Sequence, residues 1–266
     1  NGLARNAVLN RPYAIAIDRK NNIYFADQVS AIIRKIDPNG IITSISSFAY
    51  KPCENLDGKH VSSVRFGAIS GLEFDQNDNL YVSDNGCSVV YRISPSGIIS
   101  LVAGSFTYGF SGDGGPATAA RLAAPGKVAI DPDGNVYIPD TQNHRVRKVS
   151  TNGIITTIAG TGVRASNGDG IPAISADFEF PGAAVIDKAG NLYIGDYYRF
   201  IRKIDPAGIV TTFAGNGTIG YTGDGGPAIA AAILVSQGRI SIDADDAIYF
   251  CDESNAVIRK ISNCLS

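Results

Sequence analysis

The chain has 266 residues, of which 44% are hydrophobic and 18% charged, and its formal net charge is −2. Basic residues are not in excess, so nothing in the composition favours nucleic-acid binding. The longest apolar runs have about five or six residues, far fewer than the ~20 needed to cross a bilayer. Methionine is absent even at position 1, so we expect the chain to begin after processing or to be a fragment.

The chain opens with NGLARNAVLNRP, which matches the second half of an element that recurs later. The later copies are FSGDGGPATAARL from Phe110, SNGDGIPAISADF from Ser166 and YTGDGGPAIAAAIL from Tyr221. We interpret the element as a linker with a short helical turn, begun by Pro116 and capped by Asp113. Its repetition favours capping over metal or phosphate binding. The opening dozen residues are expected to be linker, not strand.

Between the linkers a unit of 56 or 57 residues occurs five times. Each copy carries an aspartate, a tight turn and a second strand with a tyrosine, as in KVAIDPDGNVYIPD of the third copy. A third strand such as RVRKVS and a β-branched fourth strand such as GIITTIAG follow. Four short strands at a fixed period predict a propeller blade. We therefore predict an all-β, five-bladed propeller as a single domain over 1–266, with blades at approximately 12–46, 69–104, 125–160, 181–215 and 238–264.

The motifs resemble the NHL repeat family, and the third copy, PGKVAIDPDGNVYIPDTQNHRVRKVSTNGIITTIAGTG, is close to that family's consensus. The resemblance covers almost the whole chain and implies a β-propeller with one blade per repeat. Three places depart from the pattern. The first linker is KPCENLDGKHVSS, Tyr91 stands where the other copies have arginine, and the fourth copy is one residue short in GDYYRFIRK.

Four cysteines without a metal-type CxxC pair favour an oxidising, extracellular compartment. Cys53 lies in the first linker and Cys87 in the turn between the second and third strands of the next blade. Both connections emerge on one face of a four-stranded blade, so we predict a Cys53–Cys87 disulfide. Cys251 and Cys264 remain as a default pair. They are roughly 20 Å apart along the strands, so the tail must fold back, or Cys264 pairs with another chain.

The last copy ends with its third strand, VIRKISNCLS, and has no fourth strand of its own. The third strand should therefore expose a sheet edge. Three explanations stay open. An upstream segment outside the sequence supplies the strand, the ring tolerates a three-stranded blade, or another chain donates a strand and gives self-assembly.

Catalytic chemistry finds little support in the sequence. The only histidines, His60 and His144, lie in different blades, which argues against a histidine-rich zinc site and against the lyase activity of some NHL-like propellers. We predict no metal and no cofactor. One aspartate ends each second strand, and we favour hydrogen bonding to turn amides over a cation-binding ring. The Arg-Lys pairs of the third strands are expected to lie on exposed edges.

Binding is the remaining function. Tyrosine-rich loops on a rigid scaffold suit recognition of a protein or a glycan. The candidate binding residues are Tyr197, Tyr198, Arg199, Phe200, Tyr108, His144 and Arg145. Asn216 begins the sequon NGT and is a candidate glycosylation site. We predict a secreted or extracellular, non-catalytic binding or structural module. The alternatives are a lyase or hydrolase with a site at the channel mouth, for which Glu73 and Arg239 are the best groups, and a filament subunit assembled through the open edge.

Overall fold

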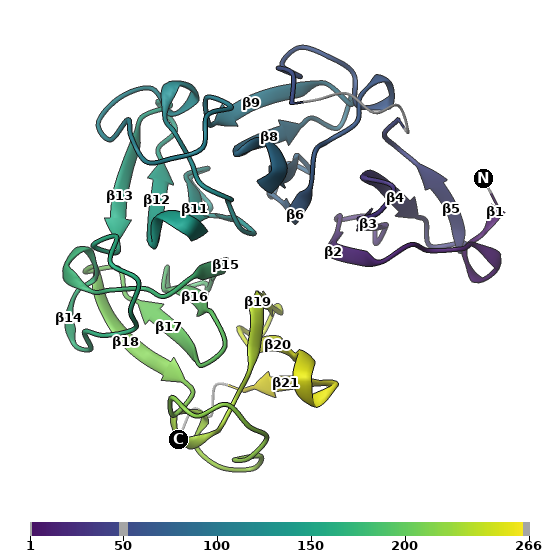
Figure 1. The fold of residues 1–266 in the computed structure, drawn as a ribbon. Helices are drawn as coiled ribbons and strands as arrows, with labels where there is room; N and C mark the ends of the chain where they lie inside the picture. The colour runs from purple at the N-terminus through teal and green to yellow at the C-terminus, as the bar shows by residue number, and fades with distance from the viewer. Residues whose placement is uncertain (1, 48–52, 263–266) are drawn as a thin grey trace. The chain divides into compact units, whose positions relative to one another are not determined.

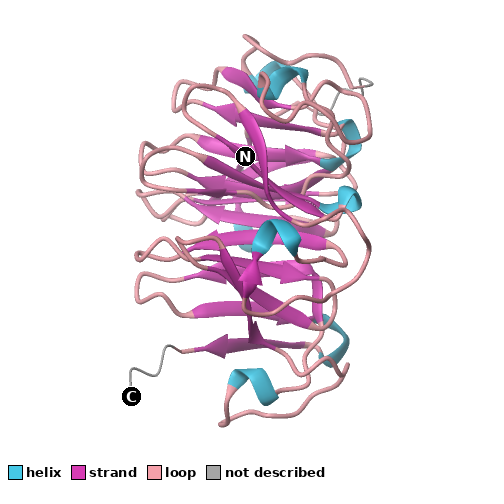
Figure 2. Cartoon of the chain, turned by 90° about the vertical axis from the view of Figure 1, so that its left-hand side faces the viewer, coloured by secondary structure: helices cyan, strands magenta, loops and turns pink. Residues whose placement is uncertain are grey.

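The computed structural model describes residues 2–47 and 53–262, and it is an all-β, five-bladed β-propeller of small antiparallel sheets. The described residues contain strands, short 3₁₀ turns and loops, as Figure 2 shows. None of their helical turns is long and apolar enough to span a membrane. The chain divides into two compact units, residues 1–135 with 149–155 and residues 136–148 with 156–266, and each is described by itself.

The strands of each repeat are paired in chain order within their sheet, and we call the fourth strand the outer strand; β1 and β14 are added beside the outer strands of the first and fourth sheets (Figure 1). The first sheet contains β2 (Pro12–Ile17), β3 (Ile23–Asp27), β4 (Ile32–Ile36) and β5 (Ile41–Ser44). The second contains β6 (Ile69–Phe74), β7 (Leu80–Asp84), β8 (Val89–Ile93) and β9 (Ile99–Ala103). The third contains β10 (Ala129–Ile130), β11 (Val136–Asp140), β12 (Arg145–Val149) and β13 (Ile155–Ala159).

The fourth sheet contains β15 (Pro181–Ile186), β16 (Leu192–Asp196), β17 (Phe200–Ile204) and β18 (Ile209–Ala214). The fifth contains β19 (Val235–Ile242), β20 (Ile248–Asp252) and β21 (Val257–Ile261), and among the described residues it has no fourth strand. The 3₁₀ turns are η1 (Ala4–Asn6), η2 (Val61–Ser63), η3 (Asn85–Cys87), η4 (Ala117–Ala119), η5 (Thr141–Asn143), η6 (Ala173–Ser175), η7 (Ala228–Ala230) and η8 (Glu253–Asn255).

The aspartate that follows each first strand builds the hairpin to the second. Asp187 Oδ1 accepts the backbone N–H of Asn191 at 2.8 Å, and its Oδ2 accepts the Asn191 side-chain amide at 2.7 Å and the Tyr193 hydroxyl at 3.1 Å. Asp131 is bonded in the same way to Asn135. The DPDGN string is therefore a turn closed by its own side chains, which is how Asp and Asn stabilise turns generally.

The aspartate that ends each second strand is buried and accepts hydrogen bonds from turn and linker groups. Asp140 accepts the Asn143 side-chain amide at 2.8 Å, and Asp84 accepts the backbone N–H groups of Gly67 and Ala68 at 2.7 and 2.9 Å. Asp84 also accepts the backbone N–H of Cys87 in the turn at 3.2 Å, so the predicted bond to a turn amide is present, together with bonds to the segment before the first strand that were not predicted. Within the described residues, no group of three or more His, Cys, Asp or Glu side chains is placed to hold a metal ion.

The expectation that the Arg-Lys pairs lie on exposed edges is wrong for the arginines. Arg147 and Arg202 are 0% and 2% exposed, and Arg147 Nη1 lies 3.2 Å from Asp140 Oδ2. The arginine side chains lie on the buried face of their sheets, where Arg147 pairs with the buried aspartate. They also bond to the linker. Arg259, for example, donates to the carbonyls of Thr222 and Ala232. A buried carboxylate needs such a partner because an unpaired buried charge is costly.

In the first four blades the preceding linker or opening segment lies along the outer strand. β14 (Ile171–Pro172) pairs with β18, and the backbone N–H groups of Gly170 and Ala173 donate to Val210 O and Gly208 O, both at 2.8 Å. The opening residues do the same, because β1 (Gly2–Leu3) pairs with β5 of the first sheet. The expectation that these residues form no strand is wrong. They extend the outer edge of the first sheet, as Figure 1 shows.

The linker aspartates have a different role from the predicted helix cap. Asp169 Oδ1 accepts the backbone N–H of Thr212 in β18 at 2.5 Å, and Asp57 Oδ1 accepts that of Leu101 in β9 at 2.9 Å. In the 3₁₀ turn η4, Pro116 occupies the N-cap position and no side chain caps the turn. The carboxylate therefore attaches the linker to the outer strand of the following blade.

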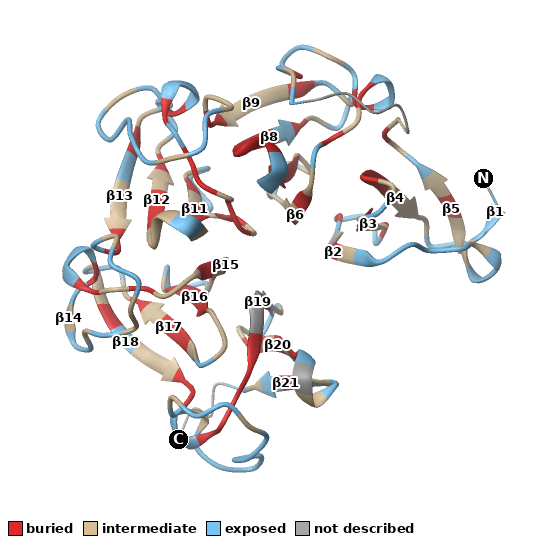
Figure 3. Cartoon of the chain, viewed as in Figure 1, coloured by how far each residue is buried: buried red, intermediate tan, exposed pale blue. Residues whose placement is uncertain are grey.

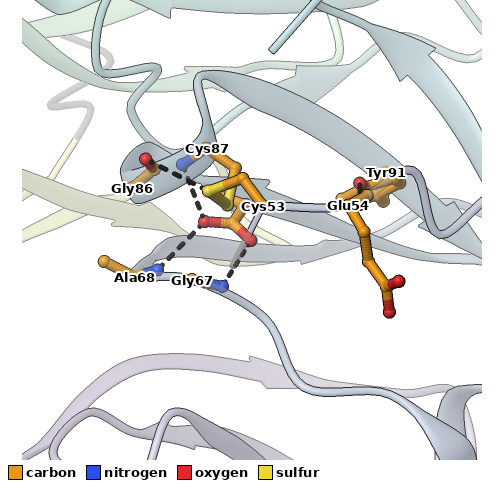
Figure 4. Close-up of a disulfide and its surroundings, with 8 residues drawn as sticks. Cys53, Glu54, Gly67, Ala68, Gly86, Cys87 and Tyr91 are labelled. Carbon is orange, nitrogen blue, oxygen red and sulfur yellow. Dashed lines mark hydrogen bonds between the residues drawn. A yellow bond between two sulfur atoms is a disulfide. The ribbon is translucent and has the colours of Figure 1, made fainter. Parts of the chain in front are cut away.

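The second blade replaces the arginine contact with a disulfide. Cys53 and Cys87 are bonded, with 5.2 Å between their Cα atoms, and this is the predicted pair (Figure 4). Tyr91, at the arginine position, donates its hydroxyl to Glu54 O at 3.3 Å. Both links attach the first linker to the second blade, the task that Arg259 performs in the fifth. Cys251 is a free thiol, and the proposed partner Cys264 lies outside the described residues.

The core consists of the apolar side chains that alternate into the space between neighbouring sheets. In the first unit, Ile33, Phe66 and Leu72 belong to one buried cluster, and in the second unit Ile201, Ile233 and Phe250 belong to another. The linker between β18 and β19 is largely exposed (Figure 3). Polar loops on a buried sheet scaffold are where binding residues are commonly placed.

Candidate functional site

Four aromatic rings gather on one surface of the second unit, and we call them the aromatic patch: His144, Phe180, Tyr197 and Tyr198. Ring centroids are 5.1 Å apart for His144 and Phe180, 5.1 Å for Phe180 and Tyr197, and 3.4 Å for Tyr197 and Tyr198. All four residues are half-buried. The two contacts at 5.1 Å lie at the centroid separations at which aromatic rings pack favourably.

The turn between the second and third strands positions two of these rings. His144 and Tyr198 both have left-handed φ, of 55° and 70°. His144 comes directly before the third strand, the position that Ala31, Ser88 and Ala256 hold with φ between 49° and 55°. The turn of the fourth blade is one residue shorter, so Arg199 comes directly before β17 and Tyr198 takes the left-handed conformation one residue earlier. Left-handed φ is uncommon for residues other than glycine. The third and fourth blades therefore place large rings in this turn, at neighbouring but not identical positions.

Backbone and side-chain hydrogen bonds hold the aromatic patch in place. Tyr198 exchanges two backbone bonds with Val235, at 3.2 and 3.1 Å, and Tyr197 N–H donates to Phe180 O at 3.2 Å. His144 Nδ1 donates to Glu179 O at 2.5 Å, because a carbonyl oxygen can only accept. The hydroxyl groups of Tyr197 and Tyr198 contact each other.

One arginine adds charge to the patch. The Arg164 guanidinium lies 4.4 Å from the centroid of the Phe180 ring and 3.3 Å from Glu179 Oε1, and its side chain is 60% exposed. A cation over an aromatic face is attracted by the ring quadrupole. Arg164 thus contacts both the Phe180 ring and the Glu179 carboxylate.

Beneath the patch lies Asp196, which is fully buried. Its carboxylate accepts the Ser166 hydroxyl at 2.8 Å and the backbone N–H groups of Phe180 and Glu179 at 2.9 and 3.2 Å. Burial raises the pKa of this carboxyl to about 6, although these hydrogen bonds and Arg202 oppose the shift. Asp196 thus joins the linker and the start of β15 to the turn that carries the tyrosines.

The other predicted binding residues have different surroundings. Arg145 donates to Asn143 O at 2.9 Å and Thr161 O at 2.6 Å, so its guanidinium supports the linker. Phe200 packs against Gly217, where an added Cβ would lie 3.2 Å from its ring. Arg199 is exposed. Tyr108 is 63% exposed and belongs to the first unit.

Sequence reasoning did not select Phe180, Arg164 or Glu179. Phe180 stands where the second and third repeats have Ala68 and Ala124. An alignment of the repeats therefore shows a large side chain in place of a small one, and this signal could have identified Phe180. Arg164 occupies the linker position of Tyr108. Its stacking on Phe180 depends on how two segments meet, and no sequence pattern contains that information.

The groups considered for catalysis and modification are also engaged. Glu73 Oε2 lies 2.6 Å from Lys127 Nζ, an ion pair within the first unit. Asn216 is exposed, and its Oδ1 accepts the Thr218 backbone N–H at 2.9 Å and hydroxyl at 2.5 Å. The sequon is accessible, and glycosylation of Asn216 stays a prediction.

Comparison with known proteins agrees with the architecture. The sequence profile of the Teneurin NHL domain matches residues 1–108 and 105–167. Teneurin-4 of Mus musculus is 31% identical over 235 residues, which cover 77% of this chain and 8% of that protein. The chain thus corresponds to a small part of the curated relatives that it matches.

Solved structures show the same fold at low sequence identity. A protein in a Nidogen/Laminin complex covers 95% of this chain and 76% of its own, with a TM-score of 0.63 and 13% identity. A streptogramin B lyase covers 97% of this chain and 70% of its own, with a TM-score of 0.57 and 13% identity. At this identity the likeness concerns the propeller fold and not the activity.

Proposed function

Because the chain belongs to the Teneurin NHL domain family, we propose that it is an extracellular, non-catalytic module that binds a protein ligand through the aromatic patch. Teneurin homologues are cell-surface or extracellular proteins, and a binding or structural role follows from that relationship. The observation that carries the finer proposal is the packing of His144, Phe180, Tyr197 and Tyr198 into one half-exposed surface.

The chemistry of the surface favours a protein over other ligands. Tyrosine and arginine are enriched at the centres of protein interfaces because they combine apolar area with hydrogen-bonding groups. Here the tyrosines are fixed by backbone bonds, so little conformational entropy is lost on binding. The ion pair of Arg164 and Glu179 at the border provides the polar rim that such interfaces have.

The test measures binding of the purified chain to intact cells. We expect saturable binding that is lost when surface proteins are digested by protease and retained after glycosidase treatment. The double change of Tyr197→Ala and Tyr198→Ala, and the single change Arg164→Ala, should each reduce affinity at least tenfold. Ile174→Ala is the control, because Ile174 is 49% exposed in η6, away from the patch contacts.

Loss of binding after glycosidase, together with hits on a glycan panel, would instead establish a glycan ligand. Unchanged affinity in both patch variants would remove the aromatic patch from the recognition surface. In either case circular dichroism of the variants must show the wild-type fold.

A further inference from the structure

The buried aspartate that ends the second strand has a different partner in the fourth blade. In three other blades the third-strand arginine forms an ion pair with it: Arg147 with Asp140 at 3.2 Å, Arg259 with Asp252 at 3.5 Å, and Arg34 with Asp27 at 3.8 Å. Arg202 of the fourth blade instead donates to Gly168 O, and its Nη2 lies 3.9 Å from Asp169 Oδ1. Asp196 is therefore a fully buried carboxyl without this ion pair among the described residues.

A serine hydroxyl takes the place of that arginine. Ser166 stands in its linker where two other linkers have Phe110 and Tyr221. The Tyr221 ring lies over Arg259, with 5.2 Å between the ring centroid and the guanidinium carbon, whereas Ser166 donates to Asp196 Oδ2 at 2.8 Å. A hydroxyl can donate or accept, so it can stay bonded to the carboxyl in either charge state, which an arginine cannot do.

Glu179 connects this carboxylate to the aromatic patch through three contacts. Its N–H donates to Asp196 Oδ2 at 3.2 Å, its carbonyl accepts His144 Nδ1 at 2.5 Å, and its Oε1 lies 3.3 Å from Arg164 Nη2. The next residue, Phe180, donates its own N–H to Asp196 Oδ1 at 2.9 Å. Two rings and one guanidinium of the surface are thus positioned through one buried carboxylate.

Protonation changes what this carboxyl can accept. Asp196 Oδ2 receives two donors, the Ser166 hydroxyl and the Glu179 N–H. A proton on Oδ2 makes that oxygen a donor, which Ser166 Oγ can accept, but the Glu179 N–H then loses its acceptor. A backbone N–H that is shielded from water and lacks an acceptor costs free energy, so we expect the segment at Glu179 to shift. Burial raises the pKa of Asp196 to about 6, which places this change in mildly acidic solution.

We infer that Asp196 is a pH switch for the aromatic patch, which binds its protein ligand while this carboxylate is charged and releases it when the carboxyl is protonated. The inference rests on the proposed function of the patch. Arg202 attracts the carboxylate and favours its charged form. The other charged or titratable side chains on the surrounding elements are Asp169 in the linker, Glu179 and Arg164 beside the patch, Tyr197 after β16 and His144 after β11.

The size of the effect follows from the fraction of molecules in the charged state. With a pKa of about 6, about nine-tenths of the carboxyls are charged at pH 7 and about one-tenth at pH 5. Because the charged form alone binds, the apparent affinity falls about tenfold between these pH values. Protonation of Asp196 does not unfold the chain, since a pKa raised by burial means that the bound proton favours the folded state.

The first measurement needs no ligand and records amide NMR spectra between pH 4 and 8. We expect the amide proton shifts of Glu179 and Phe180 to follow one transition near pH 6. The transition should be absent in Asp196→Asn and retained in His144→Phe, which separates the carboxyl from the histidine ring. Constant shifts in the wild type, or a transition that persists in Asp196→Asn, would overturn the inference.

The second measurement repeats the binding to intact cells at pH 7 and pH 5. The wild type should bind about tenfold more weakly at pH 5. Asparagine accepts and donates like the neutral carboxyl, so Asp196→Asn should bind equally at both pH values, with the weak affinity of the wild type at pH 5. Asp252→Asn makes the same change in the fifth blade and is the matched control, which should keep the wild-type ratio of affinities.

The two measurements separate this inference from the proposed function. No binding at pH 7, with the amide transition present, would reject the proposed function and still confirm that Asp196 rearranges the patch. Equal wild-type binding at both pH values, or an Asp196→Asn variant that keeps the wild-type ratio, would overturn the switch while the binding function stands.

Discussion

Individual residues determine how each blade is held together, and the same position can be served by different chemistry. Arg147, Arg202 and Arg259 pair with or approach the buried aspartate of the second strand. Tyr91 and the Cys53–Cys87 disulfide make the corresponding attachment in the second blade. The sequence shows that Tyr91 replaces the arginine of the other repeats. That the disulfide and the Tyr91 hydroxyl make the attachment instead is seen only in the folded structure, where the first linker lies against the second blade.

Asp196 gives a pH dependence whose sign follows from its burial. Its pKa in the folded chain is about 6, above the ordinary value of 3.8, so the folded state binds the proton more tightly between these values. The free energy of unfolding should therefore fall by roughly 2–3 kcal/mol as pH rises from 4 to 7.

Thermal melts at pH 4, 5, 6 and 7 measure this contribution. Asp18 and Asp243, whose pKa values are lowered, act in the opposite direction, so the comparison must be made with Asp196→Asn. We expect the free energy of unfolding of Asp196→Asn to lack this decline between pH 4 and 7, although the variant is less stable than the wild type by an amount that does not depend on pH. Parallel pH profiles of the two proteins would contradict the assignment.

Among the elements, the outer strands β9, β13 and β18 are each followed by a glycine where the strand meets the turn of its own blade. Gly215 has φ of 96°, and a Cβ there would lie 2.0 Å from Arg199 O. Gly104 and Gly160 have the same environment, with Cβ distances of 2.4 Å to Ser88 O and 2.3 Å to His144 O. The repeated alanine-glycine pair therefore reflects close backbone approach as well as left-handed φ.

Gly215→Ala should lower the free energy of unfolding by about 2–4 kcal/mol, from a steric overlap with backbone in addition to the strained φ. Gly208→Ala is the control. Gly208 also has positive φ, 80°, but no atom lies within 4 Å of an added Cβ, so about 1 kcal/mol is expected. Urea denaturation of the two variants measures the difference, and equal losses would show that the close approach is relieved at little cost.

At the scale of the whole molecule, the disulfide restricts the unfolded chain. Cys53 and Cys87 are 34 residues apart, and closing a loop of this length stabilises the folded state by about 3–4 kcal/mol in the chain-entropy description. The double change to serine should lower the melting temperature by several degrees. Cys251→Ser, which removes a free thiol, should change it little. A melting temperature unaffected by the double change would show that Tyr91 and its neighbours suffice.

The repeat, the five-bladed architecture, the strand order and the Cys53–Cys87 pair could be predicted from the residues alone. They follow from alternating apolar residues, turn aspartates and a fixed period, which recur because each blade solves the same packing problem. The hairpin aspartates were also predictable, because their partners lie within four residues. The aspartates of the second strands were predictable only in part, because Asp84 and Asp196 also bond to groups 16 or more residues away.

Three features became visible only once the chain was folded: the burial of the third-strand arginines, the docking of linkers on outer strands, and the pairing of β1 with β5. It also brought Phe180 and Arg164 to His144 and the tyrosines. These contacts join segments tens of residues apart, and their energies depend on distance and burial, which one-dimensional periodicity does not contain.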